Sequence, residues 1–373
     1  MVKPGDNVDA IAATYGINVE QLIYDNQLIY PYELALGQAL FISTGLRRPS
    51  RAIRVGGYAY PFISRWVLNE TLPFLSELFI FSYGFTAQGD LLFPLWTDEW
   101  MIEAAIQFGT KPVLTLTPLG PDGRFSNQLI SSIIQNPEYT RNLIDNLLVT
   151  MEEKGYQGVD IDFEYILPQD RDAFTSFVGQ VAETMRAYGY ETSVALAPKT
   201  SADQKGLLYE GKEYRALGEA ADYVLLMTYE WGYTYGPPMA VAPLNQVRRV
   251  VEYAITEIPP EKINLGIPNY GYDWPLPFER GVTAARTINN VQAVRIAIEQ
   301  GATIFFDETA KSPYFTYVQE GVEHEVWFED VRSLNAKFDL IDEFHLRGCS
   351  YWQIMQFFRA NWLLLRSRFF VSK

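Results

Sequence analysis

Residues 158–165 read Gly158-Val159-Asp160-Ile161-Asp162-Phe163-Glu164-Tyr165, and in this stretch acidic and apolar side chains alternate in strict period two. On a β-strand, residues i, i+2 and i+4 share one face, so the three carboxylates point to one side and Val159, Ile161 and Phe163 to the other. The stretch therefore predicts a strand with one acidic face and one apolar face.

Further short apolar runs, most of them separated by helical patterns, lie on both sides of this strand. Together with it they span residues 53–60, 78–85, 112–118, 158–165, 192–198, 223–229, 263–270 and 348–352. Strands that alternate with helices in this way predict an α/β fold, a (β/α)8 TIM barrel over residues 53–373. The interval before the last run is too long for one crossover helix and contains a β-like stretch at 315–328. It predicts a small α+β insertion at about 281–335.

The acidic face of 158–165 is expected to point into the barrel, because the neighbouring strands are apolar. Desolvating three carboxylates is costly unless they share protons and hydrogen bonds. An exposed amphipathic strand could carry the same pattern, but at this place the cost indicates function. Since the strand runs toward Leu167-Pro168, Glu164 comes last, at the C-terminal mouth where barrel enzymes place their chemistry.

The first 44 residues form a smaller unit, followed by a polar linker at 45–52. Gly5-Asp6-Asn7 precedes a helically spaced apolar set that begins at Val8, and Gly16 ends this helix. A second short helix is expected from Val19 to Asn26, and a closing strand at 36–42. With a first strand reduced to a stub, the pattern predicts a β-α-α-β unit.

This unit resembles a LysM module, in Val2 to Asp6, Ile11-Ala12, Tyr15-Gly16, Leu22, Asn26, Leu34 and 37–40. LysM modules bind glycans that contain N-acetylglucosamine, so the resemblance implies anchoring to a cell wall. The glycan contacts that it implies are Gly5, Asp6, Asn7, Leu28, Ile29 and Pro31. A small capping domain that binds nothing is the alternative.

The acidic strand itself resembles the Asp-x-x-Asp-x-Asp-x-Glu signature of family 18 glycoside hydrolases. Further matches are Met227-Thr228-Tyr229, Gly266-Ile267-Pro268, 270–274 and Ser350-Tyr351-Trp352. Joined to a LysM-like unit, and with 324–330 in the insertion, the chain is similar to the SleL-type branch of spore cortex-lytic N-acetylglucosaminidases. Two positions depart from the pattern: Gln157 stands at the first Asp of the signature, and Met355 stands where the branch often has Gly.

The resemblance implies a retaining, substrate-assisted hydrolysis, in which the 2-acetamido oxygen of the sugar attacks the anomeric carbon. Glu164 is the expected general acid, and the neighbouring carboxylates would raise its pKa. Asp162 would orient the acetamido N–H and share a proton with Asp160. Tyr229 would bind the acetamido oxygen and Trp352 would form the floor of the site, although both could instead be core aromatics.

Further candidates for substrate contact lie at or just beyond the expected strand ends. They are Tyr58, Tyr83, Lys199, Glu230, Asn269, Tyr270, Asp273 and Trp274. For Tyr58 and Tyr83, packing is an equal alternative.

Composition narrows the classes of partner. The 373 residues carry a formal net charge of −15, from 30 Lys and Arg against 45 Asp and Glu, which argues against nucleic acid. One cysteine, Cys349, and two histidines cannot form a disulfide framework or an ordinary His/Cys zinc site, so no metal or cofactor is expected. The sequence has neither a run of about 18 apolar residues nor the apolar stretch of a classical signal peptide, so no membrane insertion is predicted. A monomer is expected.

The leading interpretation is a β-N-acetylglucosaminidase that acts on peptidoglycan, in the spore cortex or its fragments, and is associated with the spore or the cell wall. One alternative is hydrolysis of chitin or chito-oligosaccharides. Another is a glycan-binding lectin on an inactive barrel, which the intact Glu164, Asp162 and Tyr229 argue against. The last is a metal-dependent hydrolase that uses the three carboxylates.

Overall fold

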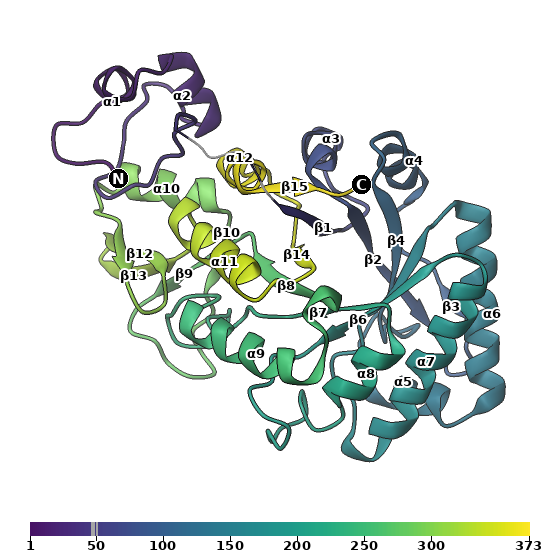
Figure 1. Cartoon of the computed structure of the whole chain (residues 1–373). Helices are drawn as coiled ribbons and strands as arrows, with labels where there is room; N and C mark the ends of the chain where they lie inside the picture. The colour runs from purple at the N-terminus through teal and green to yellow at the C-terminus, as the bar shows by residue number, and fades with distance from the viewer. Residues whose placement is uncertain (46–48, 50) are drawn as a thin grey trace.

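The computed structural model describes residues 1–45, 49 and 51–373, and it confirms the (β/α)8 barrel (Figure 1). Parallel strands pair in the order β1-β2-β4-β5-β6-β7-β8-β14, and β14 closes the barrel on β1. Their bounds are β1 Arg51–Ala59, β2 Glu77–Phe85, β4 Lys111–Leu116, β5 Gly158–Ile161, β6 Glu191–Leu196, β7 Tyr223–Leu226, β8 Ile263–Pro268 and β14 Gly348–Trp352. Short β3 (Leu91–Leu92) pairs antiparallel with β2, and short β15 (Phe369–Val371) pairs parallel with β1. Of the expected linker at 45–52, residues 46–48 and 50 lie outside the described residues.

Helices connect the strands and cover the outside of the barrel (Figure 1). They are α3 Arg65–Thr71, α4 Glu99–Gln107, α5 Asn127–Ile134, α6 Pro137–Lys154, α7 Arg171–Ala187, α8 Tyr214–Ala220, α9 Leu244–Glu257, α11 Val331–Glu343 and α12 Arg359–Arg368, with 3-10 turns η1 Leu72–Phe74, η2 Pro168–Asp170 and η3 Pro260–Lys262. Helix α6 illustrates how the sequence sets the ends: Asn136 caps its first turn, and Gly155 ends it in the left-handed conformation at φ 85°. In the part of the chain that the structure describes, no helix is long and apolar enough to cross a membrane.

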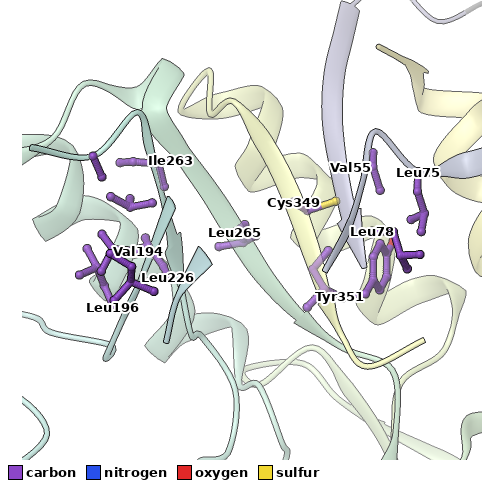
Figure 2. Packing of buried hydrophobic residues seen from close by; sticks show 14 of the residues in the cluster. Val55, Leu75, Leu78, Val194, Leu196, Leu226, Ile263, Leu265, Cys349 and Tyr351 are labelled. Atoms are coloured by element: carbon purple, nitrogen blue, oxygen red, sulfur yellow. The ribbon is translucent and has the colours of Figure 1, made fainter. Parts of the chain in front are cut away.

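The main core lies between the strands and the surrounding helices. Figure 2 shows part of it, where Val55, Leu265 and Cys349 project from different strands into the buried layer. The apolar face of 158–165 belongs to this layer, because Val159, Ile161 and Phe163 are fully buried. The ring of Phe163 stacks on Phe177 of α7 at 5.8 Å. The acidic face is thereby turned toward the barrel axis, as the alternation predicts.

Strand β5 is shorter than the expected 158–165 and ends at Ile161. The chain stays extended for one more hydrogen bond, from Asp162 N to Leu116 O at 2.9 Å. Because Phe163 still packs outward, the alternation of faces continues beyond the regular strand.

The insertion before the last strand is a five-stranded antiparallel sheet with one helix. Its elements are β9 Gly271–Pro275, β10 Arg286–Ile288, α10 Asn290–Glu299, β11 Phe305–Asp307, β12 Ser312–Gln319 and β13 Val322–Trp327. The sheet therefore starts about ten residues before the expected boundary at 281, because β9 pairs with β13. It also ends before 335, since α11 packs into the main core through Leu334 and Phe338.

The N-terminal unit has the two expected helices, α1 Val8–Tyr15 and α2 Val19–Asp25. Asn7 caps α1 and Gly16 ends it at φ 64°. The two expected strands are not regular strands in residues 1–45; Val2 instead exchanges backbone hydrogen bonds with Gly37 and Gln38, at 3.0 and 2.9 Å. These two backbone hydrogen bonds connect the first residues of the unit to the segment at 37–38.

The same unit packs against the barrel. The side chain of Gln27 donates to Phe357 O at 3.3 Å and accepts from Arg359 N at 2.6 Å. The guanidinium of Arg359 lies 3.8 Å from the ring centre of Tyr24. Two hydrogen bonds and one cation–π contact therefore connect the N-terminal unit to the barrel.

Candidate active site

Asp160 lies on the inner face of β5 and is fully buried. Its carboxylate accepts hydrogen bonds from the Tyr58 hydroxyl of β1 at 2.9 Å and from Ser193 Oγ of β6 at 2.6 Å. Burial raises its pKa to about 6, even though both hydrogen bonds and the charge of Lys212 favour the ionised form. Tyr58, one of the candidate contacts, is thus placed in the cluster as a partner of Asp160.

Asp162 and Glu164 follow the end of β5 toward the mouth. Asp162 is buried, and its Oδ1 has no hydrogen-bond partner among the described residues. Burial, followed by the charges of Glu164 and Asp160, holds the pKa of Asp162 well above its ordinary value. Burial also raises the pKa of the partly buried Glu164. Two neighbouring carboxyl groups of this kind share a proton, so that one is protonated while the other is ionised.

Tyr229 follows β7 and faces this pair. Burial, then the charges of Asp162 and Glu164, raises the pKa of its hydroxyl, so the hydroxyl keeps its proton and can donate it to an acceptor. Gly266 of β8 makes room for this turn, since a Cβ there would lie 2.8 Å from the Tyr229 ring and 2.3 Å from Leu226 O. The Gly in Gly266-Ile267-Pro268 therefore has a packing reason.

Trp352, at the end of β14, forms an aromatic wall beside the carboxylates. Its ring meets Phe81, Tyr58 and Tyr60 edge-on, with centroids 5.0, 5.7 and 6.2 Å away. Asn269 holds the chain after Trp352, because its Nδ2 donates to Gln353 O at 3.1 Å and to Gln356 O at 2.9 Å. Trp352 therefore lies at the mouth of the barrel, and Asn269 holds the backbone that follows it.

Glu230 lies at the rim beside Tyr229, in the left-handed backbone region at φ 66°. It accepts hydrogen bonds from the hydroxyls of Tyr270 and Tyr272, the latter at 3.0 Å. A non-glycine residue in this region is uncommon and is found often at functional sites. Burial, and then the charge of Glu164, raises the pKa of Glu230, so Glu230 and its partner Tyr270 lie at the edge of the carboxylate cluster.

Tyr83 and Asp273 lie away from the cluster. The ladder between β2 and β4 shifts between Phe81 and Tyr83, and such an irregularity reverses the side to which the following residues point. Tyr83 is consequently turned into the outer core, where its hydroxyl donates to Asp98. Asp273 faces the insertion sheet and binds Arg286, His324 and Tyr317, at 2.8, 2.8 and 2.9 Å. Direct contact of either with a substrate in the barrel mouth is not supported.

Lys199 and Trp274 are also engaged elsewhere. The Lys199 ammonium donates to the carbonyl oxygens of Lys212 and Ala202, at 3.0 and 3.2 Å. Trp274 is fully buried, and its Nε1 donates to Gly236 O at 2.8 Å. Both side chains hold loops of the mouth in place.

Several residues of the site were missed by the sequence interpretation. They are Ser193, Lys212, Tyr60 and Phe81. Phe81 and Ser193 carried a usable signal, since each lies on the inner face of a strand that was recognised. Lys212 lies in a loop, where no periodicity indicates the direction of a side chain. Among the described residues, no group of three or more His, Cys, Asp or Glu side chains is arranged to hold a metal ion.

Comparison with known proteins identifies the family of this site. The family model for glycosyl hydrolases family 18 matches residues 116–356. The chain belongs to glycosyl hydrolases family 18. This family 18 chain is 40% identical to the cortical fragment-lytic enzyme of Bacillus subtilis (strain 168), over 100% of the chain and 98% of that enzyme.

Solved structures agree with this assignment. The crystal structure of the spore cortex-lytic enzyme SleL of Bacillus megaterium QM B1551 superposes with a TM-score of 0.94 at 31% identity, covering 100% of this chain and 98% of that one. The Bacillus cereus SleL structure gives 0.84 at 37% identity, covering 100% and 86%. The resemblance to the family is confirmed, and the chain is a glycoside hydrolase.

The LysM domain model matches residues 1–43, which confirms the second resemblance. Its six expected contacts fall into two sets. Asp6 and Asn7 serve the turn and the cap of α1, accepting from Lys3 N at 2.8 Å and Ala10 N at 2.9 Å, and Gly5 is in the same turn at φ 86°. The other three, Leu28, Ile29 and Pro31, line a cavity of about 230 Å³ between this LysM domain and α10.

Proposed function

We propose that this family 18 enzyme is a retaining β-N-acetylglucosaminidase that cleaves peptidoglycan glycan strands by substrate-assisted catalysis. The observation that carries the proposal is the pair formed by the buried carboxyl of Asp162 and the partly buried carboxyl of Glu164, beside the protonated Tyr229 hydroxyl. Such a pair can supply one proton and one negative charge at the same time, as acid catalysis and acetamide orientation require.

In the proposed reaction, Glu164 gives its proton to the leaving glycosidic oxygen while the acetamido oxygen of the sugar bonds to the anomeric carbon. In the substrate complex the proton of the pair lies on Glu164, so Asp162 is ionised and accepts a hydrogen bond from the acetamido N–H. Tyr229 donates a hydrogen bond to the acetamido oxygen. Water then opens the cyclised acetamide from the other side, and Glu164 takes the proton of that water. Two displacements at one carbon give net retention of the anomeric configuration.

The placement of the other carboxylates supports a substrate nucleophile over a protein one. A two-carboxylate retaining mechanism needs a second carboxyl about 5–5.5 Å from the acid. Asp273 is bound to three partners in the insertion, and Glu230 is held at the rim by two tyrosines.

The names of the relatives support cortex peptidoglycan fragments as the substrate, because three curated relatives at 38–40% identity are cortical fragment-lytic enzymes. The aromatic wall of Trp352, Phe81 and Tyr60 suits the apolar face of a hexosamine. The LysM domain supports association with the spore cortex or the cell wall.

The test compares products from cortex peptidoglycan fragments and from chitin oligomers by mass spectrometry, with the anomeric configuration followed by proton NMR. We expect preferred cleavage of cortex fragments after N-acetylglucosamine, a β-anomer formed first, and inhibition by a thiazoline mimic of the cyclised acetamide. An inverted product, or a covalent sugar ester on a protein carboxylate, would overturn the mechanism. Faster cleavage of chitin oligomers would overturn the assignment of cortex fragments as the substrate.

A further inference from the structure

A buried lysine, Lys212, lies against the carboxylate cluster and has no role in the reaction above. It belongs to the loop between β6 and α8, is fully buried, and follows Gly211. A Cβ on Gly211 would lie 2.2 Å from the carbonyl oxygen of Ile166, two residues beyond Glu164. Glycine at this position therefore lets the Lys212 loop pack directly on the segment that carries the catalytic carboxyls.

The ammonium of Lys212 can be located from its hydrogen bond to Ala195 O, at 2.9 Å. Consecutive carbonyls of a strand point to opposite neighbours. Leu196 O accepts from Met227 N, on the β7 side, so Ala195 O points toward β5. Ile161 of β5 pairs with Val194 of β6, so one residue further along both strands Asp162 lies beside Ala195. The ammonium thus lies level with Asp162, at the point where β5 ends.

The backbone of Lys212 is held from the opposite side. Lys199 Nζ donates to Lys212 O at 3.0 Å, and Lys199 N donates to the Tyr214 hydroxyl at 3.0 Å. That hydroxyl in turn donates to Ala197 O of the chain after β6. Lys199 therefore fixes the loop and leaves the Lys212 ammonium facing the carboxylates.

An ammonium has three N–H groups, and one of them is directed to Ala195 O. The unpartnered Oδ1 of Asp162 is a buried acceptor in the same region. The charge of Lys212 lowers the pKa of Asp160, Asp162 and Glu164, opposing the effect of burial on each. Burial in turn lowers the pKa of Lys212 to about 8. The titratable groups that face this cluster from the surrounding elements are Asp160, Asp162, Glu164, Tyr58, Tyr60, Tyr229 and Glu230.

We propose that Lys212 is a positioning residue whose ammonium keeps one carboxyl of the Asp162–Glu164 pair ionised while the other retains its proton. The inference rests on the proposed function, which makes this pair catalytic. Lys212 does not touch the sugar; it sets the pH range in which the pair holds one proton.

The test is the pH profile of kcat/KM for Lys212→Met on a soluble cortex fragment. The methionine keeps the length of the side chain and removes the charge. Loss of a nearby cation raises the pKa of a carboxyl, so both limbs of the bell-shaped profile should move to higher pH, by about one pH unit or more. Lys212→Arg keeps the charge and should restore the limbs toward their original pH.

Lys262→Met is the matched control, because it removes a half-buried ammonium that donates to the carbonyl oxygens of Gly218 and Ala221 and lies outside the Lys212 loop. It should leave the pH of both limbs unchanged, whatever its effect on stability. A Lys212→Met profile that falls equally at all pH values, with both limbs unmoved, would overturn the proposal.

A second measurement decides the matter if Lys212→Met does not fold. The lysine ¹³Cε resonances are titrated in the wild type and in Glu164→Gln, with Lys373→Met used to assign the other lysine whose pKa burial lowers to about 8. Removing the Glu164 charge should lower the pKa of Lys212, and an unchanged value would overturn the coupling. Because this readout needs no turnover, it is separate from the proposed function, which fails if Glu164→Gln hydrolyses the fragment normally.

Discussion

Replacing Asp160 by Asn should stabilise the protein above pH 6 while reducing its activity. Asp160 is fully buried, and its pKa is about 6 in the folded state against an ordinary 3.8. A carboxyl with a raised folded pKa stabilises the fold fully below its unfolded pKa, and this contribution is lost as the pH rises through the folded pKa. Each pH unit of difference is worth about 1.4 kcal/mol, so ionised Asp160 costs the folded state about 3 kcal/mol at pH 8.

The amide that Asp160→Asn introduces can keep both hydrogen bonds, because the hydroxyls of Tyr58 and Ser193 can each donate or accept. We therefore expect the free energy of unfolding of Asp160→Asn to exceed that of the wild type by about 1–3 kcal/mol at pH 8. The difference should shrink below pH 6 and vanish near pH 4. Urea unfolding curves recorded at pH 4, 6 and 8 measure it.

Asp98→Asn is the matched control. Asp98 is also fully buried, but Lys154 Nζ and the Tyr156 hydroxyl bind its carboxylate, each at 2.5 Å. Removing a charge that is paired in this way should destabilise the fold by about 1–3 kcal/mol at pH 8. Equal loss of stability in both variants would refute the reasoning, since it would mean that the environment of Asp160 favours its ionised form.

Further predictions concern the reaction and the LysM domain. Glu164→Gln should reduce hydrolysis by about 10²–10⁴ while binding of the fragment persists, measured by turnover and calorimetry; near-normal turnover would place the acid elsewhere. Asp162→Asn should lose most activity and Asp273→Asn far less, and the reverse order would favour a protein nucleophile on the insertion. Ile29→Asp should weaken sedimentation with insoluble cortex but leave turnover of soluble fragments unchanged, because Ile29 is 61% exposed and far along the chain from the carboxylates. Sedimentation equal to that of the wild type would show that this loop is not an anchor.

The strand-borne part of the site could be predicted from the sequence because a β-strand has a fixed period. Alternation placed Asp160 and Asp162 inside and Phe163 outside, and this held even where regular pairing stops at Ile161. The same rule failed at Tyr83, since the irregularity after Phe81 reverses the facing side and no local pattern in 78–85 announces it. This one shift turned Tyr83 away from the mouth and left Phe81 as the last aromatic of β2 on the inner face.

For residues in loops, the sequence contains no signal for the direction of the side chain. Lys199 and Lys212 are both buried and both follow β6, yet one donates to loop carbonyls and the other faces the carboxylates. What separates them is a tertiary contact, the packing of Gly211 on Ile166. A single sequence contains no signal for that contact.

The buried carboxyls at the end of β5 differ from the ion-paired carboxylates buried elsewhere, and the difference points to the site independently of any family. Among the described residues, for example, Glu329 binds Lys337 at 2.8 Å with both side chains fully buried, and Glu77 lies between Arg54 and Arg347 at 2.5 and 2.9 Å. Removing one member of such a pair leaves a buried charge, so these groups serve the fold. At the end of β5, by contrast, three carboxyls share one lysine. Folding alone would favour apolar side chains there, which implies that the excess negative charge is retained for the reaction and is offset by the paired core around it.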